Sequence, residues 1–172
     1  ALDTPGVSLR RARAEVRSMD VIAHLLRRAG FDTTADEYAR YAQLGIKGAV
    51  EELVNFDQVP DDFEQQHEKD YYGRRDLATI QNLWLYRMLS TKRPLEEKMT
   101  LFWHNLFATA NSKVNEPGWM WQQNELFRKN ALGNFRALLT GVAKDPAMLR
   151  WLDGDQNRTG KPNENFAREV ME

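Results

Sequence analysis

The sequence predicts an all-α fold, an irregular bundle of about eight helices with no significant sheet. Apolar residues recur every three to four positions through most of the chain, and glycine or proline stands where such segments would end or begin. No stretch shows the strict alternation of a half-buried strand. With 172 residues and no cysteine, the chain can bury a hydrophobic core without disulfide bonds.

Three helices are predicted in the N-terminal third. The first has its apolar positions at Val21, Ile22, Leu25, Leu26 and Ala29. It stops at Gly30, because glycine favours the conformations that end a helix. Thr34, followed by Glu37, is a capping-box signal for a second helix that ends near Gly45, and a third covers residues 46–55.

The remaining helices are marked by caps and prolines. Residues 56–73 form a polar linker, after which Asp76 caps a strong helix and Pro94 begins the first turn of the most apolar one, residues 95–109. Further helices are predicted over residues 119–131 and 135–143, over residues 146–152 with Asp145 as cap and Pro146 in the first turn, and from Pro162 to the end of the chain.

The helix over residues 95–109 contains the first candidate for chemistry. Its apolar stripe, predicted to face the core, is Leu95, Met99, Phe102, Trp103, Leu106 and Phe107. His104 falls on the opposite side, with Glu97, Leu101 and Ala108. There it is either a general base or metal ligand, or an interior histidine whose hydrogen bonds link helices.

An acidic loop is the candidate metal site. Asp153, Asp155, Asn157, Thr159 and Glu164 occupy positions 1, 3, 5, 7 and 12 of a window like the calcium loop of an EF-hand. Such oxygen ligands suit calcium or another divalent cation. Arg158, however, stands where that loop needs glycine. The alternative is an Asx-rich turn in which Asp153, Asn157 and Asn163 satisfy the backbone and cap the last helix.

The last helix adds a weaker catalytic candidate. Glu164 and Arg168 are spaced for ion pairing along one face, which explains those two residues without invoking catalysis. Glu169 shares the helix with Glu164, and the two could form a carboxylate pair for acid and base work, but spacing alone does not place them in one cleft.

Charge and hydropathy narrow the expected partners. Residues 1–17 form a basic N-terminal arm, with Arg10, Arg11, Arg13 and Arg17, ahead of a helical domain over residues 18–172. The arm is either solvated or in contact with an acidic partner or an anionic surface. A net charge of −1 gives no overall attraction to phosphates, so no nucleic-acid partner is expected. No apolar run approaches the roughly 20 residues of a transmembrane helix.

Five strings, in order, carry a resemblance to a known family. They are HLLRRAGF (24–31), EKMTLFWHN (97–105), NELFR (124–128), DPAML (145–149) and NENFARE (163–169). Together they resemble the bacterial domain-of-unknown-function family numbered eighteen hundred, over about residues 21–172. No activity is established for the family, so the resemblance implies none. It implies that this chain comes from an exported protein, as many members do, and that the domain continues beyond the last residue given. Leu106 stands where the family often has a second histidine, which argues against a paired-histidine metal site.

Two function classes stay open. The first is a structural or protein-interaction component of an exported bacterial protein or assembly, whose truncated end leaves apolar surface for the rest of the same protein or for neighbouring subunits. The alternative is a metal-dependent enzyme, such as a hydrolase, in which His104 and the carboxylates of residues 153–169 are completed by the missing C-terminal part. The chain begins at Ala1 and not at Met, which slightly favours a periplasmic or extracellular protein.

Overall fold

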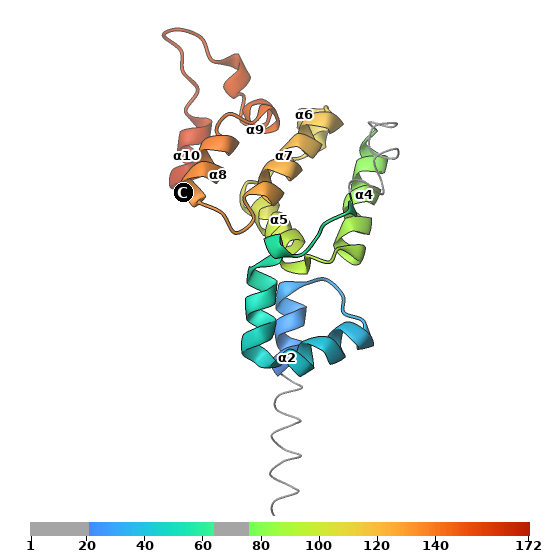
Figure 1. Ribbon diagram of the computed structural model, residues 1–172. Coiled ribbons are helices and arrows are strands. Elements are labelled where there is room, and N and C mark those ends of the chain that lie inside the picture. The colour runs from blue at the N-terminus through green and yellow to red at the C-terminus, as the bar shows by residue number, and fades with distance from the viewer. Residues whose placement is uncertain (1–20, 64–75) are drawn as a thin grey trace, which may run out of the picture. The chain divides into compact units, whose positions relative to one another are not determined.

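The computed structural model describes residues 21–63 and 76–172 (Figure 1). These residues form two compact units. Unit 1 comprises residues 21–61 and 88–98, and unit 2 comprises residues 62–63, 76–87 and 99–172. The described residues form helices and no sheet, with one isolated bridge between Arg158 and Lys161, so the predicted all-α class is confirmed. The basic arm, residues 1–17, lies outside the described residues.

Unit 1 is built on two helical segments. They are residues 21–29 and α2 (Ala35–Val54), whose first turn has the predicted capping box. The Thr34 hydroxyl accepts a hydrogen bond from the Glu37 backbone at 3.2 Å, and the Glu37 carboxylate accepts one from the Thr34 backbone at 2.8 Å. The buried core of the unit consists of Ile22, Leu26, Ala29, Tyr41, Ala49 and Leu53.

A break divides α2 at Gly45, where the sequence predicted that one helix ends and the next begins. Gly45 has φ 68° and ψ 173°, outside the helical region. This conformation is open essentially to glycine alone, because a Cβ atom would clash with the backbone. The prediction of a helix end near Gly45 is therefore confirmed.

Two basic side chains secure the loops of unit 1. Arg93, next to the start of α5 (Pro94–Leu106), donates from Nε to the Val59 carbonyl at 2.6 Å, just after the 3₁₀ helix η1 (Phe56–Gln58). Lys98 donates from Nζ to the Gly30 carbonyl at 3.0 Å and lies 4.6 Å from the centre of the Phe31 ring. These bonds satisfy carbonyl groups that follow a helix end and would otherwise need water.

Unit 2 contains most of the remaining helices. They are α4 (Leu77–Ser90) and α5, each of which also contributes residues to unit 1, and then α6 (Asn111–Val114), α7 (Pro117–Lys129), α8 (Phe135–Val142), α9 (Pro146–Trp151), the 3₁₀ helix η2 (Gly154–Gln156) and α10 (Asn165–Met171). Asp76 caps α4 as predicted, accepting from the Thr79 backbone at 3.0 Å. Asp145 caps α9 in the same way, accepting from the Met148 backbone at 2.8 Å.

The apolar core of unit 2 lies among α7, α8 and α9. Its buried residues are Phe127, Leu138, Val142 and Met148. Phe166 of α10 packs against this cluster, and α10 lies beside α8 (Figure 1). Trp103 of α5 also packs on it and donates from its indole nitrogen to the Ala131 carbonyl at 2.9 Å, which fixes the ring.

The predicted core stripe of α5 is wrong at two positions. Phe102 and Leu106 are 51% and 57% exposed, whereas Glu97 and Thr100 are 0% exposed. The buried polar side chains have interaction partners, and a helix can bury a polar face when its groups are paired. A wheel that scores only hydrophobicity cannot recognise such a face. The helix also ends at Leu106, three residues before the predicted end at Thr109.

The break at Gly45 yields a stability prediction. Gly45→Ala should lower the free energy of unfolding by about 1–3 kcal/mol, because alanine cannot adopt this backbone conformation without strain. A Cβ atom at Gly45 would have nothing within 4 Å, so the effect isolates the backbone. Urea unfolding followed by circular dichroism gives the measurement.

Gly118→Ala is the matched control. Gly118 lies within α7 in open space, and alanine there should be neutral or stabilise by up to about 1 kcal/mol. Equal stability of Gly45→Ala and the unmodified protein would contradict the strained geometry.

Candidate functional site

A pocket of about 260 Å³ opens in unit 2 among α4, α5, α6 and α7. Its apolar walls include Leu77, Ile80, Trp84, Met120 and Trp121, and its polar groups include His104, Thr109, Asn111 and Asn124. An apolar pocket with a few converging polar groups is the usual form of a small-molecule site.

His104 contributes an uncharged imidazole to this pocket. Its ring meets Trp84 edge to face at 5.3 Å between centroids, and Phe127 at 6.1 Å. Burial lowers the pKa of His104 below its ordinary value, because the charged form loses solvation. Ring contacts, and not hydrogen bonds, thus join His104 to α4 and α7 within the described part of the chain. Its predicted role as base or ligand remains a prediction.

Two asparagines in the pocket have unused hydrogen-bonding groups. Asn124 is 5% exposed, and its Oδ1 accepts from Arg128 at 2.6 Å. Its Nδ2 is buried and has no partner, and the same holds for Oδ1 of Asn111. A buried polar atom without a partner costs about 1–3 kcal/mol, so each one calls for a physical explanation. The sequence analysis missed both as site residues; only their polar character among apolar neighbours could have indicated them.

A chain of hydrogen bonds links the pocket wall to α9. Thr109 donates to Oε1 of Gln123 at 2.5 Å, and Gln123 donates from Nε2 to Asp145 at 2.7 Å. Burial raises the pKa of Asp145, while the hydrogen bonds from Met148 and Gln123 act in the opposite direction. Each buried group in this chain therefore has a partner, and the wall around Thr109 is fixed.

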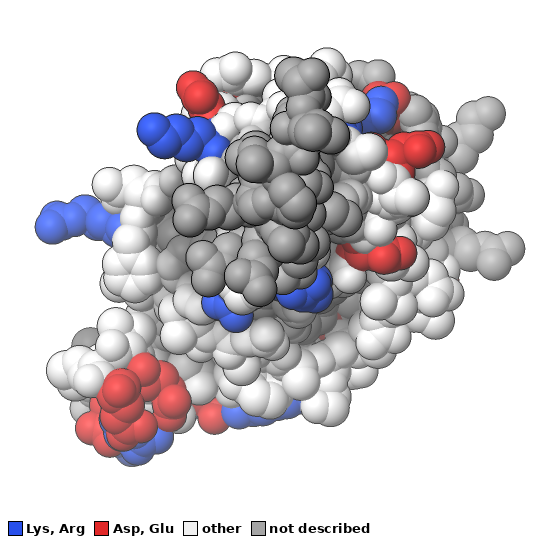
Figure 2. All heavy atoms as spheres, turned by 90° about the horizontal axis from the view of Figure 1, so that it is seen from below, with Lys and Arg blue, Asp and Glu red and all other residues white. Residues whose placement is uncertain are grey.

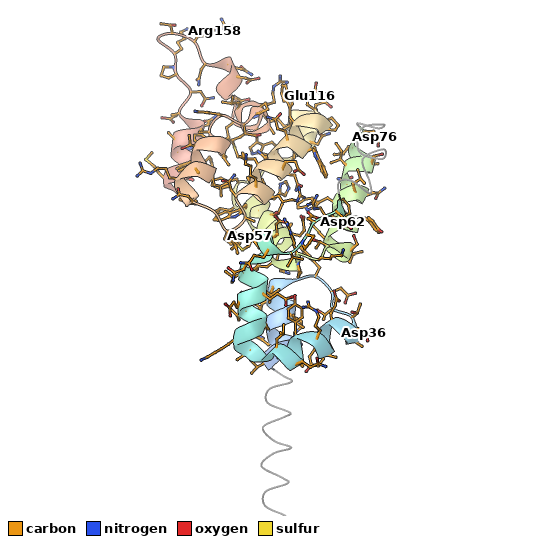
Figure 3. The ribbon with its side chains drawn as sticks, in the orientation of Figure 1. Asp36, Asp57, Asp62, Asp76, Glu116 and Arg158 are labelled. Atoms are coloured by element: carbon orange, nitrogen blue, oxygen red, sulfur yellow. The ribbon has the colours of Figure 1, made fainter. Side chains whose placement is uncertain are left out.

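The carboxylates of the acidic loop are each engaged by a basic side chain. Asp155 accepts from Nε of Arg150 at 2.7 Å, and Asp153 pairs with Lys113 at 3.0 Å. Arg158, at position 6 of the calcium-loop window, lies at the tip of the loop (Figure 3). The described residues hold no group of three or more histidine, aspartate or glutamate side chains placed to bind a metal ion.

Two residues of the turn-and-cap alternative, Asn157 and Asn163, bond to the backbone, whereas the Asp153 side chain pairs with Lys113 and makes no cap hydrogen bond. Oδ1 of Asn157 accepts from the Asn163 backbone at 2.5 Å, and Oδ1 of Asn163 accepts from the Asn165 backbone at 2.7 Å. Asn163 also donates from Nδ2 to the Leu152 carbonyl at 3.0 Å, which ties the loop to the end of α9. The cation site at Asp153, Asp155, Asn157 and Glu164 remains a prediction.

The two glutamates proposed for acid and base work face solvent. The side chains of Glu164 and Glu169 are 82% and 51% exposed. Both lie near Arg168, at 3.8 Å and 3.7 Å, the first of which is the ion pair expected along the helix. Among the described residues, no hydrogen bond or ion pair joins either glutamate to His104, whose ring contacts are with Trp84 and Phe127, and the role of the two glutamates in acid and base work remains a prediction.

A second feature of unit 2 is an exposed aromatic surface, which we call the aromatic face and define by Phe102, Trp103, Leu106, Phe107 and Phe135. Phe102 meets Trp103 at 4.9 Å between ring centroids, and Phe135 lies 6.0 Å from Trp103 and 6.5 Å from Phe107. Phe135 is 53% exposed in spite of these contacts. Phe107 stacks inward on the buried Phe127 at 6.2 Å, so the face continues into the core.

Figure 2 shows both basic and acidic side chains of the described residues, in several separate small groups. Among the described helices, none combines the length and the apolar character that a membrane crossing requires.

Comparison with protein families gives a match over most of the chain. The family model described as "Protein of unknown function (DUF1800)" matches residues 24–172. No curated protein and no solved structure matches the chain significantly.

The buried histidine yields a pH prediction. Because the pKa of His104 is lowered in the folded protein, the unfolded chain takes up the proton first as the pH falls through about 6.5. The free energy of unfolding should therefore decrease as the pH falls below that value. Above that pH, protonation of His104 does not lower the free energy of unfolding. His104→Phe should lose less stability between pH 7 and pH 5 than the unmodified protein, as measured by urea unfolding. His24→Phe, at an exposed histidine, is the matched control. Parallel pH profiles for all three proteins would contradict a lowered pKa.

The acidic loop yields a prediction about cations. Because Asp153 and Asp155 are paired with basic side chains, calcium at about 1 mM should leave the melting temperature unchanged relative to chelator. A rise that follows the calcium concentration and disappears in Asp155→Asn would instead establish the calcium site. Magnesium and zinc, tested in the same way, extend the measurement to other divalent cations.

Proposed function

The chain belongs to the DUF1800 family of proteins of unknown function, and from that premise we propose that it serves as a protein-interaction module of an exported bacterial protein or assembly. The single observation that carries the proposal is the aromatic face. Two of its exposed side chains, Phe102 and Phe135, flank the partly buried ring of Trp103, and the exposed Leu106 lies one helical turn from Phe102; exposed apolar groups gathered in this way are unusual on the surface of a protein without partners.

The rigidity of the aromatic face supports a role in binding. Trp103 is held by its hydrogen bond to the Ala131 carbonyl, and Phe107 is held by stacking on the buried Phe127. Side chains that are already ordered lose little conformational entropy when a partner covers them. Aromatic residues in such positions are typical centres of binding energy in protein interfaces.

The chemistry of the face supports an apolar partner. The exposed rings of Phe102 and Phe135 offer no charged group, so a polar ligand would lose water without compensation. The matching surface is the apolar side of a helix or of a similar segment. That segment belongs either to a different protein chain or to another part of this protein. A second copy of this chain is a separate outcome that the experiment distinguishes.

Substitution on the face tests the proposal. Phe102→Ser with Leu106→Ser should weaken partner binding at least about tenfold, because interface residues of this kind contribute about 1–2 kcal/mol each. Both side chains are more than half exposed, so the unfolding free energy should change little. Met171→Ser is the matched control, since Met171 is 81% exposed and lies outside the face.

The partner is identified by photo-crosslinking in the bacterial host. A benzophenone amino acid at Phe135 should capture one protein segment, identified by mass spectrometry, while the same amino acid at Met171 should not. Crosslinks at both positions to the same set of proteins, or only to copies of this chain, would contradict the proposal.

A further inference from the structure

The pocket around His104 lies within unit 2, to which all the residues that line it belong. Its large apolar side chains come from α4 (Leu77, Ile80 and Trp84) and from α7 (Met120 and Trp121). We infer that this pocket binds a small, uncharged, planar aromatic compound of one or two rings. Contact with these apolar walls supplies the affinity, because a ligand that enters removes both its own apolar surface and theirs from water.

The arrangement of two rings in the lining favours a planar ligand. The Trp84 indole on α4 and the His104 imidazole on α5 meet edge to face, with their centroids 5.3 Å apart and their planes at 83°. A planar ring that stacks on one of them is perpendicular to the other, and aromatic rings prefer both arrangements. Trp121 adds a second indole to the lining. An aliphatic ring of the same size gains only the burial of apolar surface.

The charges around the pocket disfavour a ligand of either sign. The described residues that line it include no lysine, arginine, aspartate or glutamate, so a charged group would lose its hydration without a counter-ion. The Arg128 guanidinium lies 5.7 Å from the centre of the Trp121 ring, which disfavours a cation there, and its pairing with Glu125 leaves it poorly suited to compensate an anion. Burial lowers the pKa of His104, so its imidazole is uncharged at pH 7.

The volume of the pocket defines the size of the ligand. That volume is about 260 Å³. A cavity of about 150 Å³ with aliphatic and aromatic walls takes up benzene, so the larger volume here leaves room for one or two rings with a small neutral substituent. Met120 lies in the wall, and its flexible, polarizable thioether adapts to ligands of slightly different outline.

Hydrogen bonds fix parts of the pocket wall without a ligand. Thr109, which lines the pocket, donates to Gln123 at 2.5 Å, and Asp76 caps α4 next to the lining residue Leu77. Walls that are already ordered lose little conformational entropy when a ligand enters, so more of the contact energy appears as affinity.

The inference does not depend on the proposed interaction function. None of the residues that define the aromatic face lines the pocket. Failure of one proposal therefore leaves the other to be judged on its own measurements.

Titration with four probes of similar size tests the inference. Phenol is neutral and planar, cyclohexanol is its aliphatic counterpart, and benzoate and benzylamine carry a negative and a positive charge on the same aromatic ring. Followed by ¹H–¹⁵N NMR, phenol should shift the indole N–H signals of Trp84 and Trp121 saturably, with a dissociation constant of about 1 mM or below. It should bind about threefold or more tightly than cyclohexanol and about tenfold or more tightly than either charged probe.

Variants separate pocket binding from surface binding. Ile80→Phe should weaken phenol binding at least about tenfold, because the added ring occupies the pocket, while Asn82→Phe, at an exposed position of α4 outside the lining, should leave the affinity unchanged. Ala110→Leu fills the pocket from the segment before α6 and gives the same test if Ile80→Phe does not fold. Thermal unfolding followed by circular dichroism establishes which variants fold.

Several results would overturn the inference. They are the lack of a saturable shift at Trp84 and Trp121, equal affinity for phenol and cyclohexanol, affinity for a charged probe that equals or exceeds that for phenol, and unchanged affinity in a folded, filled variant. A shift of the Trp119 indole as large as that of Trp84 would overturn it as well, because Trp119 is not among the residues that line the pocket.

Discussion

The two hydrogen bonds of the Gln123 side chain hold three segments of unit 2 in register. Gln123 accepts from Thr109, after the end of α5, and donates to Asp145, whose other hydrogen bond caps α9. Gln123 is 0% exposed, so these partners cannot be replaced by water. The apolar cluster around Phe127 contains residues of α7, α8 and α9. The hydrogen bonds of Gln123 position α9 relative to α7, and the packing of the cluster follows from that position. A polar contact thus specifies an arrangement that apolar packing alone leaves open.

Local rules predicted the helices well. The capping box at Thr34, the caps at Asp76 and Asp145 and the break at Gly45 were all derived from neighbouring residues, and the structure contains each of them. Such features depend on a few consecutive side chains and their own backbone, so a sequence contains the necessary information. The orientation of α5 cannot be derived from consecutive residues in this way. Which of its faces is buried depends on partners distant in the sequence, and those partners accept Glu97 and Thr100 in place of Phe102 and Leu106.

The candidate site was predicted only in part for the same reason. His104 was recognised because a histidine on the second face of a largely apolar helix is unusual, and it does line the pocket. Asn111 and Asn124 could not be recognised, because an asparagine becomes informative only when its burial and its missing partner are known. For the acidic loop, the spacing predicts a cation site, and that prediction stays open. The basic side chains that pair with Asp153 and Asp155, which are Lys113 and Arg150, lie outside the spacing argument and could not be read from it.

Helix α5 contributes residues both to the pocket around His104 and to the aromatic face, which raises the question of whether the two are energetically coupled. His104 lines the pocket, while Phe102 and Leu106, two positions away on either side, point about 160° around the helix from it and belong to the aromatic face. A shared helix transmits binding only if it has two arrangements that the two partners favour differently. Trp103, between them, is fixed by its hydrogen bond to the Ala131 carbonyl, by three neighbouring rings and by packing on the cluster around Phe127, which together oppose rotation of the helix. With that constraint, α5 supports both the pocket wall at His104 and the aromatic face as one fixed helix, and nothing in its described packing offers the second arrangement that a switch requires.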